Sequence, residues 1–359
     1  MPMKYENVCL EVFACTVPEE VVTSAAIEAR LAPLYSRLRL PEGRLELMTG
    51  IAQRRFWPPG MLPSEKSVQT AEKAIRLASL DKGHIGALVH GSVCRDYLEP
   101  ATASGVHHGL GLSRECMVYD VSNACLGLLN GVVQIANMIE LGQIRAGVAV
   151  GTESSRSLVE TTIRQLNADL SLTRKTIKQA VASLTIGSGS AAILLTDREL
   201  SRTGNRLVGG LARANSDFCH LCRSDQQDAA GADMKPLMYT DSETLMREGV
   251  RTARLAFPEF LDTVGWDAGD VDKTFCHQVG RAHHRLLFET LDLNRAIDYS
   301  TVEFLGNTGS VALPMTAALG IESGHVNNSD HLALLGIGSG INVVMLGVDW
   351  QCSLVEKVI

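Results

Sequence analysis

Short apolar runs alternate along the chain with longer segments whose apolar residues recur at helical spacing. The runs at residues 84–93, 116–121 and 146–150 predict buried strands. Residues 126–141 predict a buried helix that ends near Gly142. Strands that alternate with helices in this way indicate parallel or mixed sheets covered by helices.

The second half of the chain echoes the first. A small-residue turn and an apolar strand at residues 188–195 are similar to those at 338–345. The helix at 126–141 has a counterpart in Ser310–Gly320, ended by Gly320 or Gly324. The pattern favours a fold repeated twice, with halves at 1–185 and 186–359. Chance similarity between segments rich in Gly, Ala and Ser is the alternative.

Two stretches interrupt this repeat. Residues 160–178 are polar with helical spacing, and residues 214–237 are loop-like. Insertions of this kind often shape the mouth of a binding site.

The composition narrows the class of protein. The chain has 359 residues, 45% of them hydrophobic, and a formal net charge of −7. These values suit a globular protein and argue against nucleic-acid binding, although a local basic patch for an anionic ligand is allowed. Nine irregularly spaced cysteines predict reduced thiols in a reducing compartment. Without a signal-peptide pattern or a run of 18 apolar residues, we expect a cytoplasmic protein with no membrane span.

Cys125 is the candidate nucleophile, because it lies between a polar turn and the start of the helix at 126–141. The helix macrodipole predicts a lowered thiol pKa there. His277 and Asn307 lie in two further segments rich in small and polar residues. A thiolate can hold an acyl group, and imidazole and amide donors can stabilise an enolate oxygen. The alternatives are a structural cysteine, a core histidine bonded to backbone, and a turn asparagine.

Other polar residues suggest ligand contacts. Guanidinium groups pair well with phosphate oxygens, so four arginines are candidates for contacting the phosphates of a ligand: Arg54, Arg55, Arg247 and Arg251. The last two share a helix face, and a merely solvated face is the alternative. Cys219 and Cys222 lack a second pair of zinc ligands, and the segment at 187–189 lacks the lysine of a P-loop, so neither a metal nor an ATP site is predicted.

Five motifs in order resemble the thiolase superfamily, in its ketoacyl synthase III branch. They lie at residues 48–55, 123–125, 275–278, 306–314 and 335–340. The resemblance implies a five-layered α/β/α/β/α thiolase fold of two pseudo-symmetric halves and a homodimer. It also implies an oxyanion hole formed by the backbone N–H groups of Cys125 and Ser339.

Residues 94–100 and 151–156 narrow the resemblance to the olefin-pathway thiolases, which join two fatty acyl-CoA molecules. In that subfamily a glutamate 26 residues before the nucleophile acts as base from the partner subunit, and the matching residue here is Glu99. A surface glutamate before Pro100 is the alternative. Unlike the synthases that initiate fatty-acid synthesis, the chain has no Trp before Thr49, and Met48 replaces their Arg.

The resemblance therefore implies an acyltransferase of lipid metabolism that condenses two acyl-CoA thioesters into a β-keto product, with no cofactor besides these substrates. Acyl carrier protein or downstream olefin-pathway enzymes are the possible partners. The first alternative is a ketoacyl synthase III that uses a malonyl thioester and does not need Glu99. The second is a non-catalytic lipid-binding member of the fold, in which Cys125 would be inert.

Overall fold

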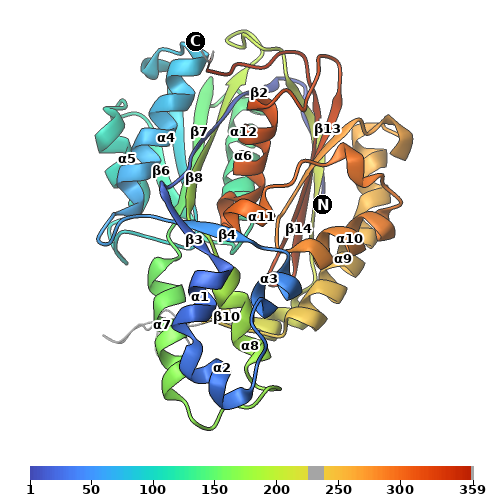
Figure 1. Ribbon diagram of the computed structural model, residues 1–359. Helices are drawn as coiled ribbons and strands as arrows, with labels where there is room; N and C mark the ends of the chain where they lie inside the picture. Colours follow the sequence, from blue (N-terminus) through green and yellow to red (C-terminus); the bar gives the residue numbers. More distant parts are fainter. Residues whose placement is uncertain (225–237, 357–359) are drawn as a thin grey trace.

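The computed structural model describes residues 1–224 and 238–356, which fold into five layers (Figure 1). Two sheets enclose a central pair of helices, α6 (Gly127–Glu140) and α12 (Ala312–Glu322). Helices α4 (Pro63–Ala78) and α5 (Thr102–Leu110) cover one sheet, and α9 (Ser242–Val264) and α10 (Arg281–Leu291) cover the other. The predicted α/β/α/β/α thiolase architecture is confirmed.

The two sheets repeat one strand order. The first contains β2 (Val8–Thr16), β8 (Gly189–Asp197), β7 (Ala146–Glu153), β5 (Ile85–Gly91) and β6 (Met117–Val121), in that order. The second contains β1 (Pro2–Lys4), β9 (Arg206–Ala214), β14 (Asn342–Asp349), β13 (His331–Gly338) and β12 (Lys273–Cys276). A single residue pair, Cys9 with Arg206, joins the sheets.

The pairing directions show that β9, β14, β13 and β12 of the second sheet correspond to β2, β8, β7 and β5 of the first. In the first sheet, β5 runs parallel to β7, and β8 is antiparallel to both β7 and β2. In the second, β12 runs parallel to β13, and β14 is antiparallel to both β13 and β9. Because β8 belongs to the first sheet, the change of half lies between Asp197 and Arg206, after the predicted boundary at 185/186.

A helical lobe projects from one end of the layers (Figure 1). It contains α1 (Ser24–Arg30), α2 (Ala32–Leu38), α3 (Arg44–Thr49), α7 (Arg156–Ala168) and α8 (Lys178–Val181). Its strands are β3 (Glu20–Thr23) paired with β4 (Gln53–Phe56), and β10 (Cys222–Ser224) paired with β11 (Met238–Thr240). The short helix α11 (Val302–Leu305) packs against β4 of the lobe and precedes α12 in the chain.

The main core lies between the sheets, where α6 and α12 bury most of their apolar side chains. In α12 apolar residues occupy all sides, as expected of a helix enclosed on every face. The predicted central helices and the buried strands at 84–93 and 146–150 are therefore confirmed. The strand at 116–121 also forms, as β6, but it lies at the sheet edge and is only partly buried. Gly320 lies inside α12, where a Cβ would come 2.5 Å from Phe275, and Gly324 follows the helix with a φ of 76°.

The predicted helix over 160–178 is only partly correct, because α7 ends at Ala168. The Asp169 carboxylate accepts hydrogen bonds from the backbone N–H and hydroxyl of Ser171, which competes with helical pairing. In the predicted loop at 214–237, residues 216–221 form a 3₁₀ turn before β10. Residues 225–237 of that prediction lie outside the described residues.

Candidate active site

The candidate catalytic residues follow strands of both halves at their carboxyl ends. Cys125 follows β6, and His277 follows β12 directly. Ser339 follows β13, and a Cβ built on Gly338 would lie 3.6 Å from Cβ of Cys125. Ligands of α/β folds bind outside the carboxyl ends of parallel strands, so this junction of the two halves is where a substrate is expected.

The Cys125 turn is held tightly. Ala124 has a φ of 45°, a left-handed conformation that costs a non-glycine residue roughly 1–3 kcal/mol. The Asn123 amide offsets this strain, because its Nδ2 donates to Asn130 Oδ1 over 2.7 Å within the same half. Its Oδ1 accepts from Asn342 Nδ2 over 3.1 Å from the other half. The nucleophile turn is thus fixed to both halves of the fold.

Two backbone N–H groups lie close enough to the Cys125 sulfur to lower the pKa of the thiol. One belongs to Cys125 and the other to Ser339, which comes from the opposite half. Preorganised backbone donors beside a nucleophile stabilise the oxyanion that forms when the nucleophile attacks a carbonyl. The structure thus places the two predicted oxyanion donors beside the candidate nucleophile.

The Cys125 thiol is less acidic than a free thiol. Burial raises its pKa to about 12, and the negative charge of Glu153 acts in the same direction. The predicted lowering of this pKa by the helix is therefore wrong, because the loss of solvation outweighs the dipole of α6 and the hydrogen bonds to the sulfur. The thiol must lose its proton in the course of the reaction.

His277 is buried at the end of β12. Its backbone N–H donates to Leu335 O over 3.1 Å, which fixes it beside β13. Burial lowers the pKa of His277 to about 3, and the neighbouring His283 lowers it further. Its Nδ1 has no hydrogen-bond partner among the described residues. His277 is therefore a neutral imidazole, which can donate one hydrogen bond and accept another.

Asn307 is held by three hydrogen bonds. Its N–H donates to Thr185 O over 3.0 Å, and its carbonyl accepts from Gly187 N over 2.8 Å. Its side-chain Oδ1 accepts from Gly309 N over 3.0 Å. Because this turn uses the amide oxygen, the amide nitrogen is the end available to a substrate. Asn307 is thus prepared to act as a hydrogen-bond donor.

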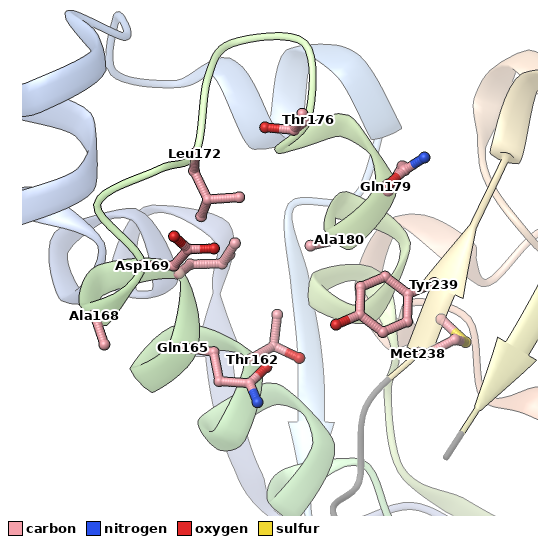
Figure 2. Close-up of a pocket in the computed structure, with 11 residues that line it drawn as sticks. Thr162, Gln165, Ala168, Asp169, Leu172, Thr176, Gln179, Ala180, Met238 and Tyr239 are labelled. Carbon is pink, nitrogen blue, oxygen red and sulfur yellow. The ribbon is translucent and has the colours of Figure 1, made fainter. Parts of the chain in front are cut away.

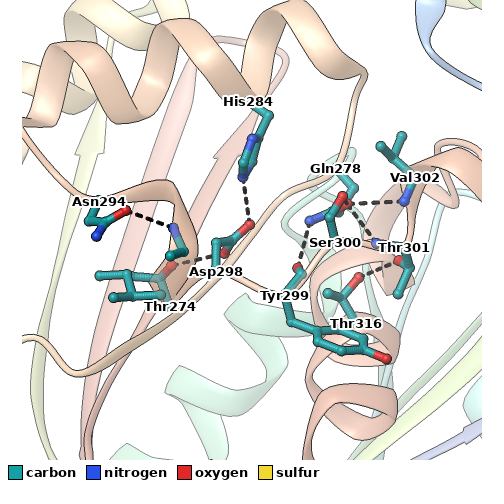
Figure 3. Close-up of polar contacts among 12 residues, drawn as sticks. Thr274, Gln278, His284, Asn294, Asp298, Tyr299, Ser300, Thr301, Val302 and Thr316 are labelled. Atoms are coloured by element: carbon teal, nitrogen blue, oxygen red, sulfur yellow. Dashed lines mark hydrogen bonds and ion pairs between the residues drawn. The ribbon is translucent and has the colours of Figure 1, made fainter. Parts of the chain in front are cut away.

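Gln278 connects the segments of His277 and Asn307 (Figure 3). Its Oε1 accepts from Ser300 Oγ, Thr301 N and Val302 N, each over 3.1 Å, and its Nε2 donates to Tyr299 O over 3.2 Å. Residues 299–302 lead through α11 to Asn307. The sequence analysis missed this role, although Gln278 stands next to His277 in the quoted motif.

The two histidines after the His277 segment are packing residues. His283 is buried, and burial lowers its pKa to about 4. His284 Nε2 lies 2.9 Å from the buried carboxylate of Asp298, which also accepts from Thr274 Oγ1 (Figure 3).

Glu99 lies apart from these residues in the single chain. It is exposed on the segment between β5 and α5. No internal contact of the described chain brings it to Cys125, so its predicted role as base requires a second subunit.

The four arginines differ in accessibility. Arg54 is fully buried, Nη1 donates to Ser24 Oγ over 3.1 Å, and burial lowers its pKa to about 10. The predicted contact of Arg54 with ligand phosphates is therefore wrong, because its charge does not reach the surface. Arg55 is partly buried and donates to Glu19 O over 3.2 Å. Arg247 and Arg251 are exposed on α9 on either side of Glu248.

A cavity of about 460 Å³ lies in the helical lobe (Figure 2). Residues of α7, of the loop after it, of α8 and of β11 line it, and among them Gln165, Leu172 and Tyr239 are drawn around the opening. None of the candidate catalytic residues belongs to its lining. Across the described ranges no cluster of His, Cys, Asp and Glu is arranged to hold a metal ion, and no helix is long and apolar enough to cross a membrane.

Two family models match separate parts of the chain. The model described as Thiolase, N-terminal domain, matches residues 62–191, which include Cys125. The model described as 3-oxoacyl-acyl-carrier-protein synthase III C terminal matches residues 261–350, which include His277 and Asn307. The two matches fall on the two halves that meet at the candidate site.

Relatives that match over most or all of their length give a more specific similarity. The acyl-CoA:acyl-CoA alkyltransferase of Shewanella oneidensis is 41% identical over 97% of this chain and 100% of its own length. The enzyme of that name from Xanthomonas campestris is 33% identical, with the same coverage. A beta-ketoacyl-acyl-carrier-protein synthase III of Neisseria meningitidis is 23% identical over 81% of this chain and 85% of its own.

Solved structures agree with these relatives. The Xanthomonas campestris OleA variant with serine in place of a cysteine, bound to lauric acid and lauroyl-CoA, has a TM-score of 0.90 and 33% identity, covering 96% of this chain and 100% of its own. Cerulenin-bound OleA has the same TM-score and identity over 97% of this chain and 98% of its own. Both likenesses extend over nearly the whole chain.

Proposed function

Because the chain belongs to the acyl-CoA:acyl-CoA alkyltransferases of the thiolase superfamily, we propose that it joins two acyl-CoA thioesters by a Claisen condensation without decarboxylation. It is a carbon–carbon bond-forming acyltransferase. The observation that carries the proposal is the full-length match to these alkyltransferases, at 41% identity for one of them. The position of Cys125 beside Ser339, with His277 held next to β13, supports it.

The first half-reaction uses the Cys125 turn. The Cys125 sulfur attacks the thioester carbonyl of the first acyl-CoA, and the negative oxygen is held by the N–H groups of Cys125 and Ser339. CoA leaves, and the acyl group stays on the sulfur. Neutral His277 accepts the thiol proton and passes it to the departing CoA thiolate, so His277 is neutral again before the second substrate binds.

The second half-reaction uses His277 and Asn307. Their N–H groups hold the thioester oxygen of the second acyl-CoA, and Glu99 removes a proton from its α-carbon. The enolate carbon attacks the acyl-Cys125 carbonyl, the carbon–sulfur bond breaks, and a β-ketoacyl-CoA forms. Hydrolysis of its thioester then yields a β-keto acid.

The working unit is a homodimer in this proposal. Strand β6 lies at the edge of its sheet, and four apolar side chains are exposed on it or on the segment that leads to Glu99: Val93, Tyr97, Leu98 and Met117. An edge strand beside an exposed apolar surface favours pairing with another chain. A second copy at this edge brings its own Glu99 toward the neighbouring site. In Xanthomonas OleA, the glutamate replaced in solved variants precedes the replaced cysteine by 26 positions, as Glu99 precedes Cys125.

Complementation tests the role of Glu99 across the interface. Glu99→Ala and Cys125→Ser chains are each expected to be inactive in condensation. In a mixed dimer, the Cys125 of one chain meets the Glu99 of the other, so random pairing should restore about a quarter of the wild-type activity. If mixing restores nothing while mixed dimers form, Glu99 does not act from the partner.

The remaining assignments belong to the same proposal. Arg55, Arg247 and Arg251 contact the phosphates of CoA. The reaction needs no cofactor besides its substrates. The enzyme works in the cytoplasm, in lipid metabolism of the olefin type. Arg247→Ala combined with Arg251→Ala should raise KM for acyl-CoA with little change in kcat, because exposed ion pairs add mainly to substrate binding.

Incubation with one acyl-CoA tests the function directly. With lauroyl-CoA alone, we expect release of CoA and a β-keto product that contains two lauroyl chains, both measured by mass spectrometry. Product formation only after a malonyl thioester is added would instead establish the decarboxylating ketoacyl synthase III reaction.

A further inference from the structure

Glu153 is a buried carboxylate at the end of β7, only 5% exposed. Its Oε1 accepts from Val93 N over 3.0 Å and from Ser310 N over 3.2 Å, and it lies 2.6 Å from Ser310 Oγ, which also lies 2.9 Å from Gly91 O. Its Oε2 accepts from Cys94 N over 3.2 Å. Three backbone N–H groups donate to this carboxylate, and such donors stabilise its ionised form. Glu153 is therefore a buried negative charge held by three backbone hydrogen bonds and the contact with Ser310 Oγ.

These donors come from both halves of the fold. Val93 and Cys94 belong to the first half, on the segment that continues to Glu99. Ser310 belongs to the second half, three residues after Asn307. The turn between them passes directly over the carboxylate, since a Cβ built on Gly309 would lie 3.1 Å from Glu153 Oε1. One side chain thus joins the segments of two proposed groups that act on the second substrate.

We propose that Glu153 is a positioning residue for the condensation half-reaction, which fixes the Asn307 turn to the segment that carries Glu99. This inference rests on the function proposed above. Glu153 touches neither substrate in this scheme. It sets where the amide of Asn307 stands, and it sets the start of the segment that presents Glu99 to the neighbouring subunit.

The negative charge of Glu153, which supports condensation, should slow the first half-reaction. It lies close enough to Cys125 to disfavour the thiolate. The titratable groups that act on this thiol are Glu153 from β7 and Cys222 from β10, and Cys94 lies against Glu153. Loss of the charge should therefore make Cys125 more reactive while condensation becomes slower. A role in folding alone would not separate the two effects.

Glu153→Gln tests this separation, because glutamine can keep the bonds at Oε1 and removes the charge and the bond from Cys94 N. Glu11→Gln is the matched control. Glu11 is a carboxylate 2% exposed, and it accepts from Arg202 N, Ser201 Oγ and Thr203 Oγ1 on the outer part of the first half. Both variants lose a buried charge with several donors, and only Glu153 faces the candidate site.

Three measurements are made on each variant: the rate of Cys125 alkylation by iodoacetamide at pH 8, the first equivalent of CoA released from lauroyl-CoA, and the steady rate of β-keto product. For Glu153→Gln we expect faster alkylation, a retained first equivalent of CoA, and condensation slower by roughly tenfold or more. For Glu11→Gln we expect all three near wild type.

The inference is overturned if Glu153→Gln alkylates and condenses like wild type, or if every rate falls together. Should Glu153→Gln fail to fold, Ser310→Ala removes the shortest bond to the carboxylate and should slow condensation without slowing the release of the first CoA. If the wild type makes no product from lauroyl-CoA alone, the proposed function fails. The alkylation comparison between Glu153→Gln and Glu11→Gln still decides whether the charge acts on Cys125.

Discussion

The turns that carry Cys125 and Asn307 occupy corresponding places in the two halves. Cys125 lies between β6 and α6, and Asn307 lies between the Asp298 segment, which pairs with Thr274 beside β12, and α12. The first turn leaves a sulfur beside two backbone donors. The second turn uses the backbone groups and the amide oxygen of Asn307 internally and leaves the amide nitrogen available.

This difference shows how a repeated fold yields two chemical tasks. The first turn offers a nucleophile with an oxyanion site, which suits acyl transfer. The second turn offers a fixed neutral donor, which suits an enolate. Gln278 and Glu153 hold the second turn in place relative to His277 and to the first half. The predictions below separate the two tasks.

Replacing the nucleophile should have the largest effect. Cys125→Ser should lower condensation about 10⁴-fold or more, because a serine hydroxyl is less acidic and far less nucleophilic than a thiol. The check is the rate of β-keto product formation from lauroyl-CoA, together with the intact mass of the protein. An acyl adduct on Cys125→Ser that turns over near the wild-type rate would contradict the assignment.

Removal of the donor in the second turn should affect condensation more than acylation. Asn307→Ala should slow condensation about 10²- to 10³-fold, the usual cost of losing one oxyanion donor. Asn307→Asp keeps an oxygen for Gly309 N and removes the donor, so it should lose as much activity as Asn307→Ala. Full activity in Asn307→Asp would show that only the shape of the turn matters.

The raised pKa of Cys125 predicts that its rate of alkylation depends steeply on pH. Because the pKa of Cys125 is raised to about 12, its thiolate fraction should rise about tenfold for each pH unit below that value. Since the pKa of His277 is lowered to about 3, the imidazole stays neutral over this range. Alkylation should therefore accelerate about a hundredfold from pH 7 to pH 9. A plateau in the alkylation rate near pH 8 would contradict this.

Removing the Gln278 contacts that hold the Asn307 turn should have the smallest effect. Gln278→Ala removes the acceptor for Ser300, Thr301 and Val302, so condensation should fall about tenfold while the first equivalent of CoA is still released. Gln69→Ala, on the exposed face of α4, is the control and should leave both steps unchanged. Equal loss of both steps in Gln278→Ala would indicate a general defect in folding.

Local patterns in the sequence were sufficient to predict the layers of the fold and the turn that contains Cys125. The apolar runs around Cys125 specify strands and a buried helix whatever lies elsewhere in the chain. Arg54 shows the limit, because an arginine in a motif gives no sign of whether its guanidinium is buried. Glu153 and Gln278 act through partners 21 to 157 residues away, and such pairings are not visible in local spacing. The thiol pKa depends on burial, which the helix position alone did not reveal.

Trapping the acyl group on the enzyme tests the separate roles of Cys125 and Asn307 most directly. Asn307→Ala is mixed with lauroyl-CoA, and its intact mass is measured together with the yield of β-keto product. We expect one lauroyl group per chain, located on Cys125, with almost no condensed product. An unmodified Cys125, or condensation at the wild-type rate, would contradict the account.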